Sequence, residues 1–302
     1  INRISGIKVI GDNVECRIKG TYGIPNVAFG NTTLATANQN ITYYYDEANL
    51  VTRIENRNAF RFCANFIDFK FNALNYIGSS AFSGSGVVNV NMSHLPAVIT
   101  GEWADMFNSC MQLISADLGN LESGSSIFVN CRNIDGALIA MKIKAYGIMF
   151  RNAGKIGSNF YNEYVLSCGR LCFADACGFA EIELPNCTVF NGTAFYKGNT
   201  STNQYLKKVI APKVTSIGQT DSDGIGTCFT RNTQLELLDI RACKNFYNTN
   251  NFLTAMKAGG VIKVHQAMIT SGDPNGELLY LKNTRDVTVE FYNDLGVYVS
   301  TL

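Results

Sequence analysis

The feature that most limits the folds open to this chain is an internal repeat of about 22 residues. Phenylalanine marks each copy, and apolar or small residues follow at offsets of 3, 6, 9, 11 and 14. Five copies keep this pattern well, and three weaker copies fill the gaps between them. The copies begin at Phe60, Phe82, Phe107, Phe128, Phe150, Phe173, Phe195 and Phe229. A fixed period of this length predicts a solenoid of stacked units.

The spacing within a copy predicts one short strand per unit. Residues at offsets 9 and 11 alternate with polar residues, as Ile182 and Leu184 do after Phe173, which is typical of a strand with one buried face. The other inward offsets belong to turns that close over the same core. One unit buries about five side chains, worth roughly 2 kcal/mol each. Ordering its backbone costs about 1–2 kcal/mol per residue, so stacking must supply the remaining stability.

Three segments of the repeat resemble a known family, the BspA-type leucine-rich repeat. The resemblance is carried by Leu74–Phe82 (LNYIGSSAF), Leu184–Thr188 (LPNCT) and Ala211–Gly218 (APKVTSIG). It extends over about residues 51–243. It implies a leucine-rich-repeat solenoid with a parallel β-sheet on the concave face and short helical or irregular returns. It also implies a surface protein that presents this sheet for recognition.

The two ends depart from the repeat and are predicted to cover it. Residues 1–50 are expected to form a β-rich N-terminal cap or linker, residues 51–245 the solenoid of about eight units, and residues 246–302 an α/β C-terminal capping module. Such covers protect the open edges of a stacked sheet. The chain begins with Ile1 and shows no secretion signal, so we expect a further segment upstream, through which the chain could form homo-oligomers.

The ten cysteines leave two interpretations open. One is a disulfide framework, or a metal site near Cys168, Cys172 and Cys177. The other is a set of buried free thiols, because free cysteine behaves as a small hydrophobic residue. The positions in the repeat favour buried thiols, since residues such as Cys63 and Cys110 occupy inward offsets.

Composition and motifs argue against several classes of function. A net charge of +1 provides no electrostatic footprint for nucleic acid, and no apolar run is long enough to insert in a membrane. His94 and His265 stand alone, without metal-ligand spacing. Asp221–Gly224 lacks the full ligand series of a calcium loop. We therefore expect no metal, no cofactor and no enzyme.

One carboxylate pair needs separate consideration. Glu181 and Glu183 alternate on a predicted strand and face outward together. Glycosidases use two carboxylates about 5–9 Å apart on either side of a cleft. The spacing fits, but a solvated pair on a strand is the more common situation, so glycan hydrolysis is not the favoured hypothesis.

The outward strand positions predict a binding surface on the concave face. They mix charged, polar and apolar side chains, a combination that suits sugar or protein recognition. The candidate ligand-binding residues are Lys70, Asn91, Asp117, Leu138, Phe160, Glu183, Ile210, Asp239 and Arg241. The insertion Asn199–Gln204 and the loop Gln219–Gly226 are rival sites, since long departures from a repeat often carry function.

The leading hypothesis is a non-enzymatic surface recognition module. Segments within residues 259–280 are similar to those that end such repeat arrays in gut Bacteroidales and their phages. This resemblance implies a phage tail or fibre component on the virion surface, which joins other virion subunits and contacts a bacterial glycan or protein. The alternatives are a bacterial cell-surface or secreted adhesin and a structural spacer without a ligand of its own.

Overall fold

The computed structural model divides into two compact units, Ile1–Lys142 and Ile143–Leu302. Side chains are described for residues 51–54, 58–74, 76–93, 104–175, 177–198, 205–218, 228–247, 256–270, 273 and 276–302. In the first 50 residues the structure describes four strands, by their backbone alone. His94, Asn199–Gln204 and Gln219–Gly226, which the sequence singled out, lie outside the described residues.

The described strands of the first unit form three small sheets. Strand β2 (Asn13–Arg17) pairs antiparallel with β1 (Ile7–Ile10) and parallel with β4 (Ile41–Tyr44). The second sheet is parallel and comprises β3 (Gly23–Ile24), β5 (Arg53–Ile54) and β6 (Tyr76–Ile77). The third is parallel too, with β7 (Asn89–Asn91), β8 (Ser115–Asp117) and β9 (Ile139–Ala140), the last directly preceded by the 3-10 turn η2 (Gly136–Leu138).

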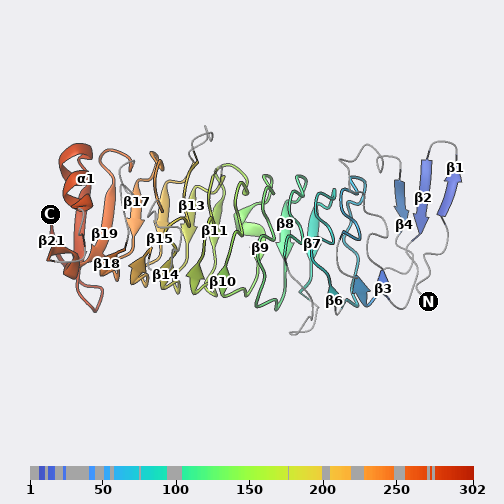
Figure 1. Ribbon diagram of the computed structural model, residues 1–302, viewed down its shortest axis with the longest axis horizontal. Coiled ribbons are helices and arrows are strands. Elements are labelled where there is room, and N and C mark those ends of the chain that lie inside the picture. Colours follow the sequence, from blue (N-terminus) through green and yellow to red (C-terminus); the bar gives the residue numbers. More distant parts are fainter. Residues whose placement is uncertain are drawn as a thin grey trace. The chain divides into compact units, whose positions relative to one another are not determined.

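The second unit is built on a seven-stranded sheet in which neighbouring strands come from successive repeats (Figure 1). Its first five strands are parallel: β11 (Asn159–Tyr161), β13 (Glu181–Glu183), β15 (Lys208–Ile210), β17 (Leu237–Asp239) and β19 (Val261–His265). Strand β20 (Thr288–Tyr292) continues the parallel order, and β21 (Tyr298–Thr301) closes it antiparallel. The central residues of the first four strands are buried, and the alternating pattern predicted this for Ile182, Val209 and Leu238 but not for Phe160.

The same unit has a second parallel sheet that the sequence did not predict. It comprises the two-residue strands β10 (Ala145–Tyr146), β12 (Ser167–Cys168), β14 (Val189–Phe190), β16 (Ser216–Ile217) and β18 (Asn245–Phe246). Each turn of the chain therefore adds one strand to each sheet. Together the two sheets pair backbone groups on both sides of a narrow core, which a buried backbone requires.

The marker phenylalanines form the centre of that core. In the first unit the rings of Phe60 and Phe82 stack at 5.2 Å. In the second unit Phe150 stacks on Phe173 at 5.3 Å, and Phe195 stacks on Phe229 at 4.8 Å. Offset stacking of this kind adds about 0.5–1.5 kcal/mol per pair beyond area burial. Because these rings repeat with the strands, the structure confirms the predicted solenoid within each unit.

The C-terminal part of the second unit brings in helix. After β19 come the 3-10 turn η3 (Gln266–Ile269) and helix α1 (Glu277–Arg285). Asp273 caps this helix, because its carboxylate accepts hydrogen bonds from the backbone nitrogens of Glu277 and Leu278 at 2.9 and 2.8 Å. Leu278 and Leu281 are buried. The domain boundaries at 50/51 and 245/246 remain predictions.

The cysteines of the described part of the chain are buried free thiols. The Sγ atoms of Cys187 and Cys168 lie 4.0 Å apart, about twice the length of a disulfide bond. Among the described residues, no group of three or more metal-ligating side chains comes together. The helices of this part of the chain are also too short or too polar to span a membrane.

Candidate recognition surface

The outward face of the seven-stranded sheet brings three side chains from successive repeats into one row. In the parallel ladder Tyr161 lies beside Glu183, and Glu183 lies beside Ile210. We call Tyr161, Glu183 and Ile210 the sheet triad. The Tyr161 side chain is 53% exposed, Glu183 is exposed and Ile210 is half-buried. The triad thus combines an amphipathic ring, a carboxylate and an aliphatic side chain on a rigid sheet.

A second row runs alongside the sheet triad. It contains Asn159, Glu181 and Lys208, which are the first residues of the same three strands. Lys208 Nζ donates to Glu181 Oε1 at 2.7 Å, and this hydrogen bond raises the pKa of the Lys208 ammonium. Both side chains are more than a third exposed, so the ion pair contributes little to stability. Among the described residues it leaves Glu183 as the unpaired acid of the Glu181–Glu183 pair.

The prediction for Phe160 was wrong, because Phe160 faces the core. It is 1% exposed and stands beside Ile182 in the ladder, whereas Asn159 and Tyr161 are exposed. The strand of this repeat begins one residue later than the offsets indicated. Since side chains alternate along a strand, a shift of one residue exchanges the two faces. Tyr161 is therefore the outward aromatic residue that the sequence analysis missed.

Leu138 does not occupy the strand position predicted for it. It belongs to η2 and is 51% exposed, while Ile139 and Ala140 form the strand. In the ladder of the first unit Asp117 lies beside Ala140. The cause is Asp135, whose side chain accepts a hydrogen bond from the Ala137 nitrogen and caps the 3-10 turn. The turn delays the strand by two residues.

The remaining candidates of the first unit are polar and partly engaged. Asn91 and Asp117 lie side by side in the β7–β8 ladder. The Asn91 side-chain oxygen accepts a hydrogen bond from the Ser93 nitrogen at 3.0 Å, and the Asp117 carboxylate accepts one from the Gly119 nitrogen at 2.8 Å. Lys70 is exposed and lies 3.5 Å from Asp68. The first unit therefore presents a polar row in which Asn91 and Asp117 stabilise the turns that follow their strands.

Asp239 and Arg241 form a covered ion pair rather than a free surface. Asp239 is 3% exposed and follows Ile210 in the ladder. Arg241 Nε donates to Asp239 Oδ1 at 3.0 Å, and a second guanidinium nitrogen donates to Oδ2. The guanidinium carbon lies 5.0 Å from the centroid of the Tyr292 ring. Asp239 was predicted to be exposed, and that prediction was wrong because Arg241 covers it.

The ion pair belongs to a cluster at the C-terminal end of the sheet. The Tyr292 hydroxyl donates to Glu290 Oε2 at 2.7 Å, and Lys263 Nζ lies 3.8 Å from the same carboxylate oxygen. Burial, followed by the hydrogen bond to Glu290, raises the pKa of Tyr292 to about 12. The bidentate Asp239 contact raises the pKa of Arg241. The described charged groups of this cluster neutralise one another, whereas Tyr161 and Glu183 of the sheet triad are exposed.

One family model agrees with this architecture. A family model described as BspA type leucine-rich repeat region matches in 6 copies, over residues 21–114 and 103–202. No curated protein matches the chain. A crystal structure of a leucine-rich cell surface protein from Faecalibacterium prausnitzii A2-165 has 14% sequence identity and a TM-score of 0.35, covering 85% of this chain and 86% of that one. Since the family model covers more than half of the sequence, the chain belongs to the BspA-type leucine-rich-repeat family.

Proposed function

We propose that this chain is a non-enzymatic surface recognition module that binds its ligand through the sheet triad. The observation that carries the proposal is the exposure of Tyr161 beside Glu183 on neighbouring strands. Tyrosine contributes a large contact area at low conformational cost and is enriched where proteins bind partners. The parallel ladder holds both side chains at a fixed spacing, so a ligand meets a prepared surface.

The chemistry of the triad suits a glycan or a polar protein surface. The Tyr161 ring can pack against an apolar patch of the ligand, and the Glu183 carboxylate can accept hydrogen bonds from hydroxyl or amide groups. Ile210 extends the apolar contact along the ladder. Recognition rather than glycan hydrolysis is proposed because Lys208 engages Glu181 at 2.7 Å. That contact occupies one member of the carboxylate pair that hydrolysis would use.

The finer proposal is that the module sits on a phage tail or fibre and contacts a bacterial host. Its support is the resemblance of segments within residues 259–280 to the ends of repeat arrays in Bacteroidales and their phages. The alternative is an adhesin on a bacterial cell surface. The two differ in their target, since a phage component binds bacterial cells and an adhesin binds host glycans or proteins.

The test is binding of the purified chain to intact Bacteroidales cells and to an array of bacterial and host glycans and proteins. Wild type is compared with a Tyr161→Ala, Glu183→Ala double variant. Tyr298→Ala is the matched control, because Tyr298 is also 53% exposed but lies on β21. We expect the double variant to lose binding at least tenfold and the control to keep it.

Each outcome of this experiment has a defined meaning. Binding confined to bacterial cells or their glycans favours the phage proposal, and binding confined to host molecules favours the adhesin. Binding that survives in the folded double variant rules out the sheet triad as the site. Absence of binding to every target favours a structural spacer.

A further inference from the structure

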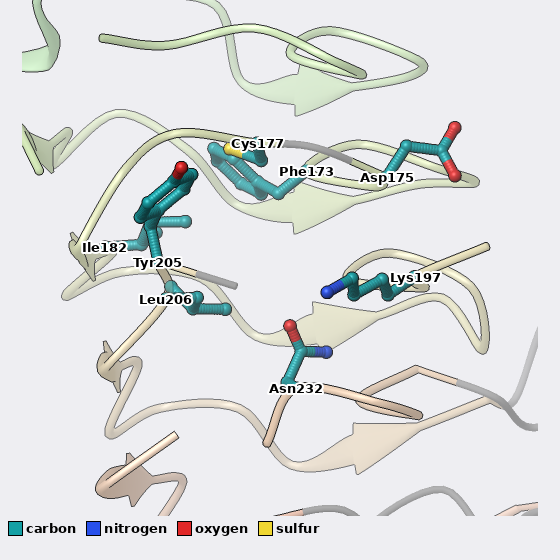
Figure 2. A pocket seen from close by; sticks show the side chains of 8 residues that line it. All are labelled: Phe173, Asp175, Cys177, Ile182, Lys197, Tyr205, Leu206 and Asn232. Carbon is teal, nitrogen blue, oxygen red and sulfur yellow. The ribbon is translucent and has the colours of Figure 1, made fainter. Parts of the chain in front are cut away.

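The pocket beside Lys197 (Figure 2) is too small to hold a ligand. It has room for about one water molecule. In Figure 2 the Asn232 amide oxygen faces Lys197, whereas the Tyr205 hydroxyl points away from it. A larger partner has no access there and must contact the exterior of the second unit.

Strand β21 forms a free edge on that exterior. It is the last strand of the seven-stranded sheet and pairs on one side with β20 (Figure 1). The Val297 carbonyl and the Leu302 nitrogen form hydrogen bonds on the β20 side, at 3.0 Å each. Because backbone groups alternate in direction along a strand, those of Tyr298 and Thr301 point away from β20. The outer edge of β21 can therefore accept a further strand.

This edge lacks the charges that usually protect a free strand. Soluble proteins place charged residues, proline or a bulge at such edges to prevent pairing with another chain. Residues 295–302 contain no charged residue and no proline. Strands β13, β15, β17, β19 and β20 of the same sheet each contain at least one charged residue. A bulge at Val299 is present, so β21 has one protecting feature instead of several.

The side chains along this edge are apolar and exposed. Five of the eight residues 295–302 are exposed apolar residues, and Leu295 is 87% exposed. We call them the edge patch: Leu295, Val297, Tyr298, Val299 and Leu302. Together they expose on the order of 300 Å² of side chain. Single apolar residues are ordinary on a protein surface, but a contiguous group of this kind marks a contact site.

The partner that fits the edge patch is the edge patch of a second copy. A charged segment would lose its hydration against these side chains, whereas a second edge patch carries no charge. The neighbouring Asp294 is neutralised within its own chain, because Lys244 Nζ donates to its Oδ1 atom at 2.5 Å. The net charge of the chain is only +1, so two copies scarcely repel each other.

We propose that two copies of this chain pair their β21 strands antiparallel, about a two-fold axis, so that the two seven-stranded sheets become one continuous sheet. A two-fold contact uses the same residues on both copies, and it stops at two because each copy has one β21 edge. The edge patch is smaller than the about 800 Å² per partner of a standard interface, so the dimer dissociates in the micromolar range. The proposal does not depend on the function of the sheet triad, which lies on β11, β13 and β15.

Sedimentation velocity of the purified chain tests the dimer, from about 1 to about 300 μM, a range that brackets a micromolar dissociation constant. We expect the mass to rise from 33.1 kDa to twice that value. Val299→Lys should weaken association about tenfold or more, because it brings two ammonium groups together in the pairing. Leu166→Lys is the matched control, since Leu166 is 47% and Val299 46% exposed, and Leu166 lies outside the edge patch. Circular dichroism checks that both variants fold.

Hydrogen exchange locates the contact without any substitution. Amides of residues 295–302 should exchange more slowly at the highest concentration than at the lowest, and those of residues 159–168 should not change. A mass of one copy at every concentration overturns the proposal. A dimer that survives in folded Val299→Lys, or that leaves the exchange of residues 295–302 unchanged, places the contact elsewhere and also overturns it. Species larger than a dimer would show open-ended pairing with another segment, which contradicts the two-fold contact.

Discussion

Phe160 lies directly beside Ile182 in the parallel ladder between β11 and β13, and both side chains are buried. This register turns the next two residues, Tyr161 and Glu183, outward as neighbours. The core therefore sets the spacing of the sheet triad. The centroid of the Phe160 ring lies 4.9 Å from that of Phe150 and 5.4 Å from that of Phe179. A change of the Phe160 side chain therefore alters the packing of its own repeat and of the next.

Phe160→Ala is expected to lower the free energy of unfolding by about 3–5 kcal/mol, because it leaves a cavity among packed aromatic rings. Tyr161→Ala, one residue later, should change it by less than about 0.5 kcal/mol, since its side chain is 53% exposed. Urea unfolding followed by circular dichroism measures both. Similar losses of unfolding free energy for the two variants would contradict this register, in which Phe160 faces the core and Tyr161 faces outward.

The repeat could be predicted from the sequence, but its local register could not be predicted in every copy. Where the turn has the standard length, as before Ile182, the offset identified the buried residue correctly. Before Phe160 and Ile139 the turn is longer by one and two residues, respectively. Strand periodicity is 2, so a single added residue reverses the face that a strand presents. The three-residue strands are too short to reveal their own phase.

Gly178 allows two repeats to approach closely. A Cβ atom added there would lie 2.2 Å from the carbonyl oxygen of Gly154 in the preceding repeat. Gly178→Ala must therefore push the backbones apart, and we expect a loss of about 3 kcal/mol or more. Gly157→Ala is the control, because an added Cβ meets nothing within 4 Å there, and only the strain of its positive φ, about 1 kcal/mol, remains. Thermal unfolding compares the two, and an equal loss would contradict the steric argument.

The buried thiols predict a loss of stability in alkali. Burial raises the pKa of Cys110, Cys177 and Cys243 from 9.0 to about 12 each. The folded state therefore holds these protons more tightly than the unfolded state. Their contribution is complete below about pH 9 and is lost as the pH rises toward 12. Urea unfolding at pH 8, 10 and 11 should give a falling free energy of unfolding.

A chemical measurement checks the same prediction independently. Thiol reagents such as 5,5′-dithiobis(2-nitrobenzoate) should label Cys110, Cys177 and Cys243 slowly in the native protein and fast in urea, because thiolates react and buried thiols stay protonated. Peptide mapping identifies the labelled residues. Rapid native labelling of these three, or a free energy of unfolding that does not change with pH, would contradict the burial.

The covered state of Asp239 could not be predicted from the repeat. Its position in the ladder equals that of Glu183, which is exposed. The two positions differ because Asp239 is covered by Arg241. The Arg241 guanidinium in turn lies over the ring of Tyr292, which belongs to the C-terminal strand pair. That contact joins residues 51 positions apart and follows no period. Periodicity locates the outward positions of a solenoid, and the packing of its ends decides which of them remain open.

The Asp239–Arg241 pair yields the last prediction. Arg241→Met leaves the Asp239 carboxylate, 3% exposed, without its guanidinium partner. Removing a charged hydrogen-bond partner from a buried group should lower the free energy of unfolding by about 1.5–3 kcal/mol. Lys208→Met removes an ion pair of similar length on the same sheet, but both of its members are more than a third exposed, so the loss there should stay below about 1 kcal/mol.

A double variant separates the ion pair from the contact between Arg241 and the Tyr292 ring. In Asp239→Asn, Arg241→Met the buried charge is gone, so part of the loss should return, with a coupling energy of about 0.5–3 kcal/mol in urea unfolding. In the wild type the Arg241 guanidinium also lies over the Tyr292 ring. The part of the loss that comes from this cation–π contact persists in both variants that lack Arg241. A double variant whose loss equals the sum of the single losses would mean that Asp239 and Arg241 act independently. The Tyr292 contact alone would then account for the effect of Arg241.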